Sequence, residues 1–202
     1  GPAQDVHEAL QSREALNRDA AAKQLRLVRR SARRLLRMVE QLLDLARHDA
    51  DLLTLQARPV DPADAVGAIV QAFQPLAEAE GVTLTLDAEP DSSEDGSVYL
   101  DVTFLEHILG NLLANALKFT PGGGRVTVCL GGDDTHIQLD VADTGPGIPE
   151  AEQERIFDRF AQGRSTSQDG GVGIGLALAH TLTERHGGTL TVDSTVGTGS
   201  TF

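Results

Sequence analysis

The distribution of glycine and proline divides the chain into two parts that must fold differently. Neither residue occurs from Ala3 to Ala57, where alanine, leucine, arginine and glutamate dominate, whereas glycine recurs through the rest of the 202 residues. Glycine and proline interrupt helices, so the first part is predicted to be almost continuous helix. Pro59 disfavours helix at the residue before it, and we therefore expect domains over residues 1–57 and 58–202.

The helical part carries an apolar stripe that one helix cannot bury. Its members alternate three and four positions apart, as in a coiled coil or helical bundle. They are Leu25, Val28, Ala32, Leu35, Val39, Leu42 and Ala46. The stripe needs another helix, either the segment before Ala20 folded back as a hairpin or the same helix of a second subunit, and we expect both. Residues 3–57 are thus predicted to form a homodimer through a helical hairpin.

The second part is predicted to be an α/β sandwich, in which helices cover one face of a mostly antiparallel sheet, so the fold class is α+β. Asp61 followed by Pro62 is typical of a helix start, and Gly81 of a helix end. A second helix is capped by Asp101 and closes at Phe119. We expect further helix over 174–185 and strands over 82–86, 97–100, 125–130, 135–142, 189–194 and from Gly199 to Phe202.

Charge and composition argue against several functions. The formal net charge of -13 disfavours nucleic acid as a partner, because phosphate binding needs clustered basic side chains. The basic stretch from Lys23 to Arg37 is either a solvated helix face or a docking surface for an acidic protein. No run approaches the roughly 18 apolar residues of a membrane span. The lone Cys129 allows no internal disulfide and is interpreted as a buried apolar residue, which fits the reducing cytoplasm.

Three polar side chains share one face of the helix that follows Asp101. Asn111, Asn115 and Lys118 fall at positions i, i+4 and i+7. The opposite side is apolar and is formed by Leu105, Ile108, Leu109, Leu112 and Ala116. Asparagine is a mediocre helix former that needs hydrogen-bond partners, so the two amides are either satisfied structural groups or placed ligands.

Two glycine-rich stretches supply a candidate ligand for that face. Asp143 follows a strand, where its carboxylate can accept a hydrogen bond from an exocyclic amine, and Gly145 and Gly147 let the backbone turn beside a flat ring. The same pattern also describes ordinary turns. The stretch from Gly170 to Gly175 leads into a helix, whose first N–H groups can bind phosphates. Between them, Ile156 to Phe160 is an apolar island in a polar segment that is either disordered or a lid, and its two phenylalanines favour a lid that docks.

Taken in order, these motifs resemble those of a bacterial sensor histidine kinase. They are Asn111-x-x-x-Asn115-Ala116-x-Lys118, Asp143-x-Gly145-x-Gly147, Phe157-x-x-Phe160, Gly171-x-Gly173-x-Gly175-Leu176 and Gly197-Thr198-Gly199-Ser200-Thr201-Phe202. The likeness makes residues 60–202 similar to a catalytic ATP-binding domain of the GHKL, or Bergerat, type. Residues 25–47 resemble the second helix of a dimerisation and histidine-phosphotransfer hairpin.

The resemblance implies ATP and Mg²⁺ as cofactors and assigns roles on the phosphate side. Asn115 would bind Mg²⁺, Asn111 would support the metal or phosphate, and Lys118 would contact phosphate oxygens. Arg159 and Arg164 would touch the γ-phosphate.

The resemblance also assigns roles around the base and in the lid. Asp143 would bind the adenine amine, with Gly145 and Gly147 beside the base and Thr201 assisting through water. The hinge and the phosphate-facing end of the lid would be formed by Gly171, Gly173, Gly175 and Leu176. Val172 stands where many relatives have serine or threonine, which removes one hydroxyl contact to phosphate.

The implied function is transfer of the ATP γ-phosphoryl group to a histidine, for relay to an aspartate on a response-regulator receiver domain. No His-Glu-Leu-Arg-Thr-Pro acceptor motif is present, and His7-Glu8 is a poor match, so we expect the acceptor to precede residue 1. One alternative is an ATPase of gyrase or chaperone type, in which a glutamate base would replace Asn111. Another is a nucleotide-binding dimer scaffold. We expect a cytoplasmic location, in a parent protein that is free or membrane-anchored.

Overall fold

The computed structural model describes residues 54–88, 98–132, 136–161 and 173–202. The chain divides into two units, Gly1–Arg47 and His48–Phe202, and every described residue lies in the second. The predicted hairpin and dimer over residues 3–57 fall outside the described residues except at 54–57. These four are irregular rather than helical, because the Gln56 N–H is committed to the Asp101 carboxylate at 2.7 Å instead of to a helical carbonyl.

Five strands form the main sheet, in the order β2-β4-β5-β7-β6. Strand β2 runs parallel to β4, and the other neighbouring pairs are antiparallel, which confirms the mostly antiparallel sheet. The bounds are β2 (Thr83–Ala88), β4 (Arg125–Gly132), β5 (Ile137–Asp143), β6 (Asp193–Thr195) and β7 (Gly199–Thr201). The strand predicted over 189–194 is wrong for its first part, because β6 pairs with β7 only from Asp193 onward.

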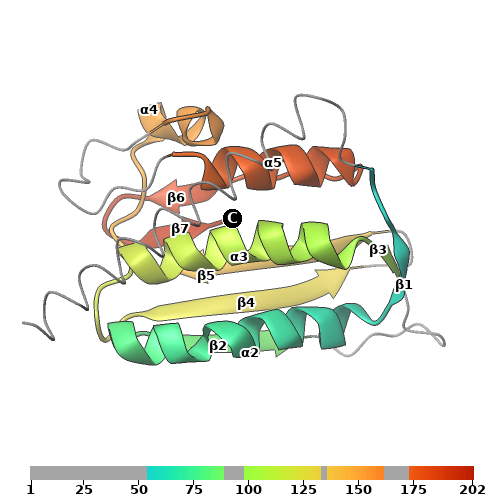
Figure 1. The fold of residues 1–202 in the computed structure, drawn as a ribbon. Helices are drawn as coiled ribbons and strands as arrows, with labels where there is room; N and C mark the ends of the chain where they lie inside the picture. The colour runs from blue at the N-terminus through green and yellow to red at the C-terminus, as the bar shows by residue number, and fades with distance from the viewer. Residues whose placement is uncertain (1–53, 89–97, 133–135, 162–172) are drawn as a thin grey trace, which may run out of the picture. The chain divides into compact units, whose positions relative to one another are not determined.

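Three helices cover one face of this sheet (Figure 1). They are α2 (Pro62–Glu80), α3 (Val102–Phe119) and α5 (Gly175–Arg185), and α3 lies between the other two. Asp61 caps α2, and Gly81 ends it with φ of 68°, as predicted from the local sequence. The largest fully buried side chains come from the three helices, from the residue before α5, and from β4 and β5: Leu109, Leu113, Leu117, Ile174, Leu178, Val66, Val126, Val128 and Val141. None of the described helices is long and apolar enough to cross a membrane.

Three short elements were not predicted. Strand β1 (Arg58–Val60) pairs antiparallel with β3 (Val98–Leu100) in a separate two-stranded sheet. Helix α4 (Glu150–Gln153) and a single 3₁₀ turn, η1 (Arg155–Phe157), follow the loop after β5. They form part of the segment predicted to be a lid.

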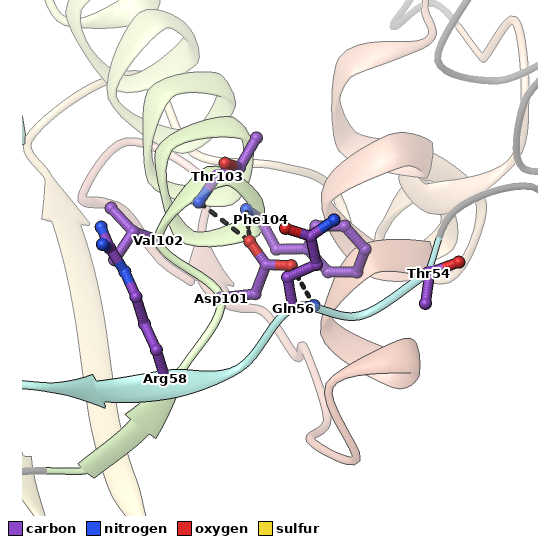
Figure 2. Close-up of a pocket in the computed structure, with 7 residues that line it drawn as sticks. All are labelled: Thr54, Gln56, Arg58, Asp101, Val102, Thr103 and Phe104. Atoms are coloured by element: carbon purple, nitrogen blue, oxygen red, sulfur yellow. Dashed lines mark hydrogen bonds between the residues drawn. The ribbon is translucent and has the colours of Figure 1, made fainter.

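Asp101 connects three parts of this fold at the beginning of α3. Its carboxylate accepts hydrogen bonds from the N–H groups of Thr103 and Phe104, which caps the helix, and from Gln56 (Figure 2). Its own N–H donates to Nε2 of His186, which follows α5, at 2.9 Å. With 4% of its surface exposed, Asp101 is a buried carboxylate whose charge is stabilised by backbone donors.

Candidate functional site

Helix α3 presents the polar face that its sequence predicts. Leu105, Leu109, Leu112 and Ala116 are buried in the core, and Ile108 packs against it. Asn111 and Asn115 are half-buried and Lys118 is exposed. Nδ2 of Asn111 donates to the carbonyl of His107 at 2.7 Å, one turn earlier. Nζ of Lys118 lies 4.6 Å from the centroid of the Phe119 ring.

Asp143 ends β5 with its side chain held by the loop that follows. The N–H of Gly145 donates to Oδ1 of Asp143 at 2.7 Å. Burial raises the pKa of the Asp143 carboxyl, and hydrogen bonds from the backbone of Gly145 and of Ser200 oppose that effect. Asp143 is therefore a desolvated acceptor at a strand end, the kind of group that can bind an amine inside a pocket.

Gly145 brings this loop to the carboxyl-terminal end of α3. A Cβ atom at this position would lie 2.7 Å from Oδ1 of Asp143 and 3.2 Å from the carbonyl oxygen of Phe119. Any other residue would push Asp143 away from the helix end. The loop 143–147 thus lies against the end of the helix that carries Asn111, Asn115 and Lys118.

The hairpin formed by β6 and β7 supports the other side of the loop. Gly197 donates its N–H to the carbonyl of Pro146 at 2.8 Å. Gly147 has φ of 70° and lies against the backbone of Thr195, so a side chain there would be strained and would also collide.

The lid region is described at its two ends, and these ends lie together. The N–H of Phe160 donates to the carbonyl of Gly173 at 2.8 Å, and Gly173 has φ of 72°. The Phe157 ring packs on His180 of α5, with centroids 5.1 Å apart, and edge-on against Phe202 at 6.4 Å. The predicted docking of this island through a phenylalanine is confirmed for Phe157, whereas Phe160 is 60% exposed.

The structure describes some, but not all, of the other residues predicted to form the lid or to contact phosphate. Gly175 is the first residue of α5, and within the described residues no side chain caps this helix start. Leu176 packs against the core, and Arg159 is exposed. Gly171 and Arg164 lie outside the described residues.

Ser200 is a residue beside Asp143 that the sequence motifs did not assign to the site. The register places Ser200 opposite Asp143, whereas Thr201 lies opposite Ala142, so it is Ser200 that shares a sheet face with Asp143. Ser200 is 7% exposed and Thr201 is exposed. Alternation along the strand separates the two residues onto opposite faces, but only the pairing with β5 shows which one faces Asp143.

A pocket of about 410 Å³ lies at the opposite end of α3 from Lys118 (Figure 2). Its lining includes Gln56, Arg58 and the first turn of α3, and none of the residues predicted to bind a ligand. The Asp101 carboxylate, which also lines it, accepts three backbone N–H groups.

Cys129 differs from its predicted role. It is half-buried rather than buried, on the sheet face opposite the helices, between Asp87 and Asp140 of the neighbouring strands. Burial and then the two carboxylates raise the pKa of its thiol. The residue is therefore a poor nucleophile at neutral pH.

A one-sided α/β sandwich with a glycine loop at the end of a polar-faced helix and an uncapped helix start after a lid defines an ATPase domain of the GHKL class. The chain belongs to the family described as histidine kinase-, DNA gyrase B- and HSP90-like ATPases, which matches residues 100–202. Its sequence is homologous to the catalytic domains of sensor histidine kinases.

Two relatives illustrate the match. Hybrid signal transduction histidine kinase D of Dictyostelium discoideum is 36% identical over 89% of this chain, and Sensor protein DivL of Caulobacter vibrioides is 39% identical over 87%. The chain spans only 12% and 22% of the lengths of these curated relatives. The crystal structure of full-length ShkA in complex with AMPPNP superposes with a TM-score of 0.72 at 32% identity, covering 83% of this chain and 34% of ShkA.

Proposed function

We propose that residues 58–202 are the catalytic core of a sensor histidine kinase, which binds Mg-ATP and transfers its γ-phosphoryl group to a histidine. The observation that carries the proposal is the contact of Gly145 with the Phe119 carbonyl, which brings the loop that holds Asp143 to the end of the helix that carries Lys118. The Asp143 carboxylate suits the amine of the base, and the Lys118 ammonium at the helix end suits the phosphates.

On the base side, Asp143 binds the exocyclic amine of adenine. Gly145 and Gly147 let the loop pack closely against Phe119 and Thr195, where a side chain would collide, and this packing holds Asp143 in place for the ring. Ser200 takes the position beside Asp143 that the sequence had suggested for Thr201.

On the phosphate side, Asn115 provides an oxygen ligand for Mg²⁺ and Lys118 contacts phosphate oxygens. The part of the chain that the structure describes holds no cluster of three or more His, Cys, Asp or Glu side chains suited to a metal. Most ligands of the metal would then be phosphate and water oxygens, which is usual for Mg²⁺. The N–H groups at the start of α5 and the arginines Arg159 and Arg164 add positive potential.

The residues support phosphoryl transfer better than hydrolysis. Transfer needs charge neutralisation and in-line positioning, which metal, Lys118 and helix N–H groups supply. Hydrolysis by a gyrase-type ATPase needs a base to activate water, and Asn111 is a neutral amide whose Nδ2 is engaged by His107. Asn111 therefore orients the phosphate side without accepting a proton.

The partners follow from the same proposal. A homodimer through residues 3–57 would present the acceptor histidine, and a response-regulator receiver domain would take the phosphoryl group from it. We place this core in the cytoplasm, where ATP and receiver domains are found.

Titration calorimetry of the 202-residue chain with AMPPNP, with and without Mg²⁺, tests the binding step. Mg²⁺ should strengthen binding, and Asn115→Ala should abolish that increase. Gln138→Ala, which removes an exposed amide on β5, is the matched control and should leave it intact. Absence of nucleotide binding would favour the scaffold alternative.

A second experiment tests transfer. Labelled ATP is supplied together with a histidine-bearing dimerisation hairpin from a relative, and acid-labile, base-stable label on the hairpin is expected. Steady phosphate release without labelled protein would favour the ATPase alternative. The chain alone should acquire no label, and label on His7 would show that this residue is the acceptor.

A further inference from the structure

Ser194 lies in none of the sequence motifs, yet its side chain is the centre of the contacts behind the Asp143 loop. Its Oγ accepts the N–H of Ile148 at 2.8 Å, lies 2.9 Å from the carbonyl oxygen of Gly199, and lies 2.9 Å from Oγ of Ser200. One hydroxyl thus contacts the loop after Asp143 and two consecutive residues of β7.

The hydrogen-bonding capacity of a hydroxyl fixes the direction of these bonds. Ser194 has one proton to donate and two lone pairs to accept. The carbonyl of Gly199 can only accept and the N–H of Ile148 can only donate, whereas the Ser200 hydroxyl can do either. All three contacts are hydrogen bonds only when Ser194 donates to Gly199 and Ser200 donates to Ser194.

This arrangement leaves the Ser200 hydroxyl with lone pairs but no proton to offer elsewhere. Ser200 stands opposite Asp143 on the same sheet face, and Asp143 is also an acceptor. Side by side, the two groups present acceptors only. With both acceptors directed at position 6, the pair matches the two hydrogens of the adenine amine and repels the carbonyl oxygen that guanine carries there.

Gln153 holds the same loop without touching the Ser200 hydroxyl. Its Nε2 donates to the carbonyl of Ile148 at 2.9 Å and to that of Ser194 at 2.8 Å, joining the start of the lid to β6. Two side chains therefore fix the loop, but only one of them decides where the Ser200 proton points.

We propose that Ser194 is a positioning residue that sets the purine selectivity of the nucleotide site, by orienting the Ser200 hydroxyl so that only acceptors face the base. The proposal rests on the function proposed above. Ser194 contacts no part of the nucleotide itself.

The test compares affinities for AMPPNP and GMPPNP, each with Mg²⁺, by calorimetry of the full chain. Wild-type protein should prefer AMPPNP, and Ser194→Ala should lower that preference by about tenfold, because the released Ser200 hydroxyl can rotate and donate to guanine. Gln153→Met should weaken both ligands by a similar factor and keep the ratio. Ser194→Thr, which retains the hydroxyl, should restore the wild-type ratio.

The matched control is Thr195→Ala, which removes a neighbouring hydroxyl whose side chain is exposed. An unchanged ratio in Ser194→Ala, with binding retained, would overturn the proposal while leaving the proposed function standing. A wild-type chain that binds neither nucleotide would instead refute the proposed function. Circular dichroism spectra matching wild type are required of each variant, and a ratio that changes equally in Thr195→Ala would also overturn the proposal.

Discussion

Replacing Asp143 by asparagine should weaken nucleotide binding and strengthen the unliganded fold at the same time. The change keeps the size of the side chain, and the amide oxygen can still accept the Gly145 N–H that now reaches Oδ1 at 2.7 Å. The amide NH₂ then occupies the place of the second carboxylate oxygen and faces the adenine amine, donor against donor. A hydrogen bond to a charged group contributes about 1.5–3 kcal/mol, so affinity for AMPPNP should fall by roughly 10- to 100-fold.

The stability effect follows from the raised pKa of Asp143. Its cause is burial, so in the folded chain this carboxyl holds its proton to a higher pH than in the unfolded chain, where the ordinary value is 3.8. Between the two values the folded state binds more protons, and the free energy of unfolding falls as pH rises. Above the pKa of Asp143 in the folded chain, the full free-energy cost of burying the ionised carboxylate is present. A neutral asparagine side chain carries no such cost, so Asp143→Asn should be the more stable protein at pH 7, and its advantage should shrink as pH falls toward 3.8.

Calorimetry at pH 7 measures the affinity, and urea unfolding at a series of pH values measures the stability. Asp140→Asn is the matched control, since this carboxylate lies in the same strand and accepts a hydrogen bond from the exposed Gln138 side chain. Undiminished affinity in Asp143→Asn would refute its role as the adenine acceptor. A variant less stable than wild type at pH 7 would refute the desolvation argument, whatever happens to binding.

Two further predictions concern stability and reactivity. Asp101→Ala removes the cap of α3 and the bond to Gln56, so urea unfolding should show a free energy of unfolding lower by about 2–3 kcal/mol. Asp101→Asn keeps an acceptor and should lose less. Equal stability of Asp101→Ala and wild type would contradict this prediction. The pKa of the Cys129 thiol is raised by burial and by Asp87 and Asp140, so iodoacetamide at pH 7.5 should alkylate this residue more slowly in the folded chain than in urea. Mass spectrometry follows the reaction. Asp140→Asn should accelerate the alkylation of the folded chain.

Local chemistry in the sequence was enough to predict α2 and α3. The caps at Asp61 and Asp101 act through side-chain bonds to N–H groups two and three residues away, so both ends of each bond are visible in one short stretch. Glycine in a left-handed conformation at Gly81 is equally local. These boundaries agree with the structure because nothing distant decides them.

The pairing of distant strands could not be predicted in the same way. Strand β1 has only three residues, and its pairing with β3, about forty positions later, leaves no periodicity to detect. The choice between Ser200 and Thr201 depends on the register of β7 against β5. Sequence motifs identified Asp143 and the polar face of α3 separately, but the contact that unites them is one backbone approach at Gly145.

Helix α3 sets the distance between the segment that enters the catalytic core and the phosphate side of the site. Its 18 residues correspond to about 27 Å at 1.5 Å per residue. At one end Asp101 bonds Gln56 and His186, and at the other the Phe119 carbonyl meets the loop of Asp143. Because α5 is followed by His186, whose Nε2 accepts the backbone N–H of Asp101, both α3 and α5 are tied to this one residue. A side-chain change at Asp101 leaves its N–H bond to His186 in place, so its effect on nucleotide affinity should pass through α3 and follow the loss of the helix cap.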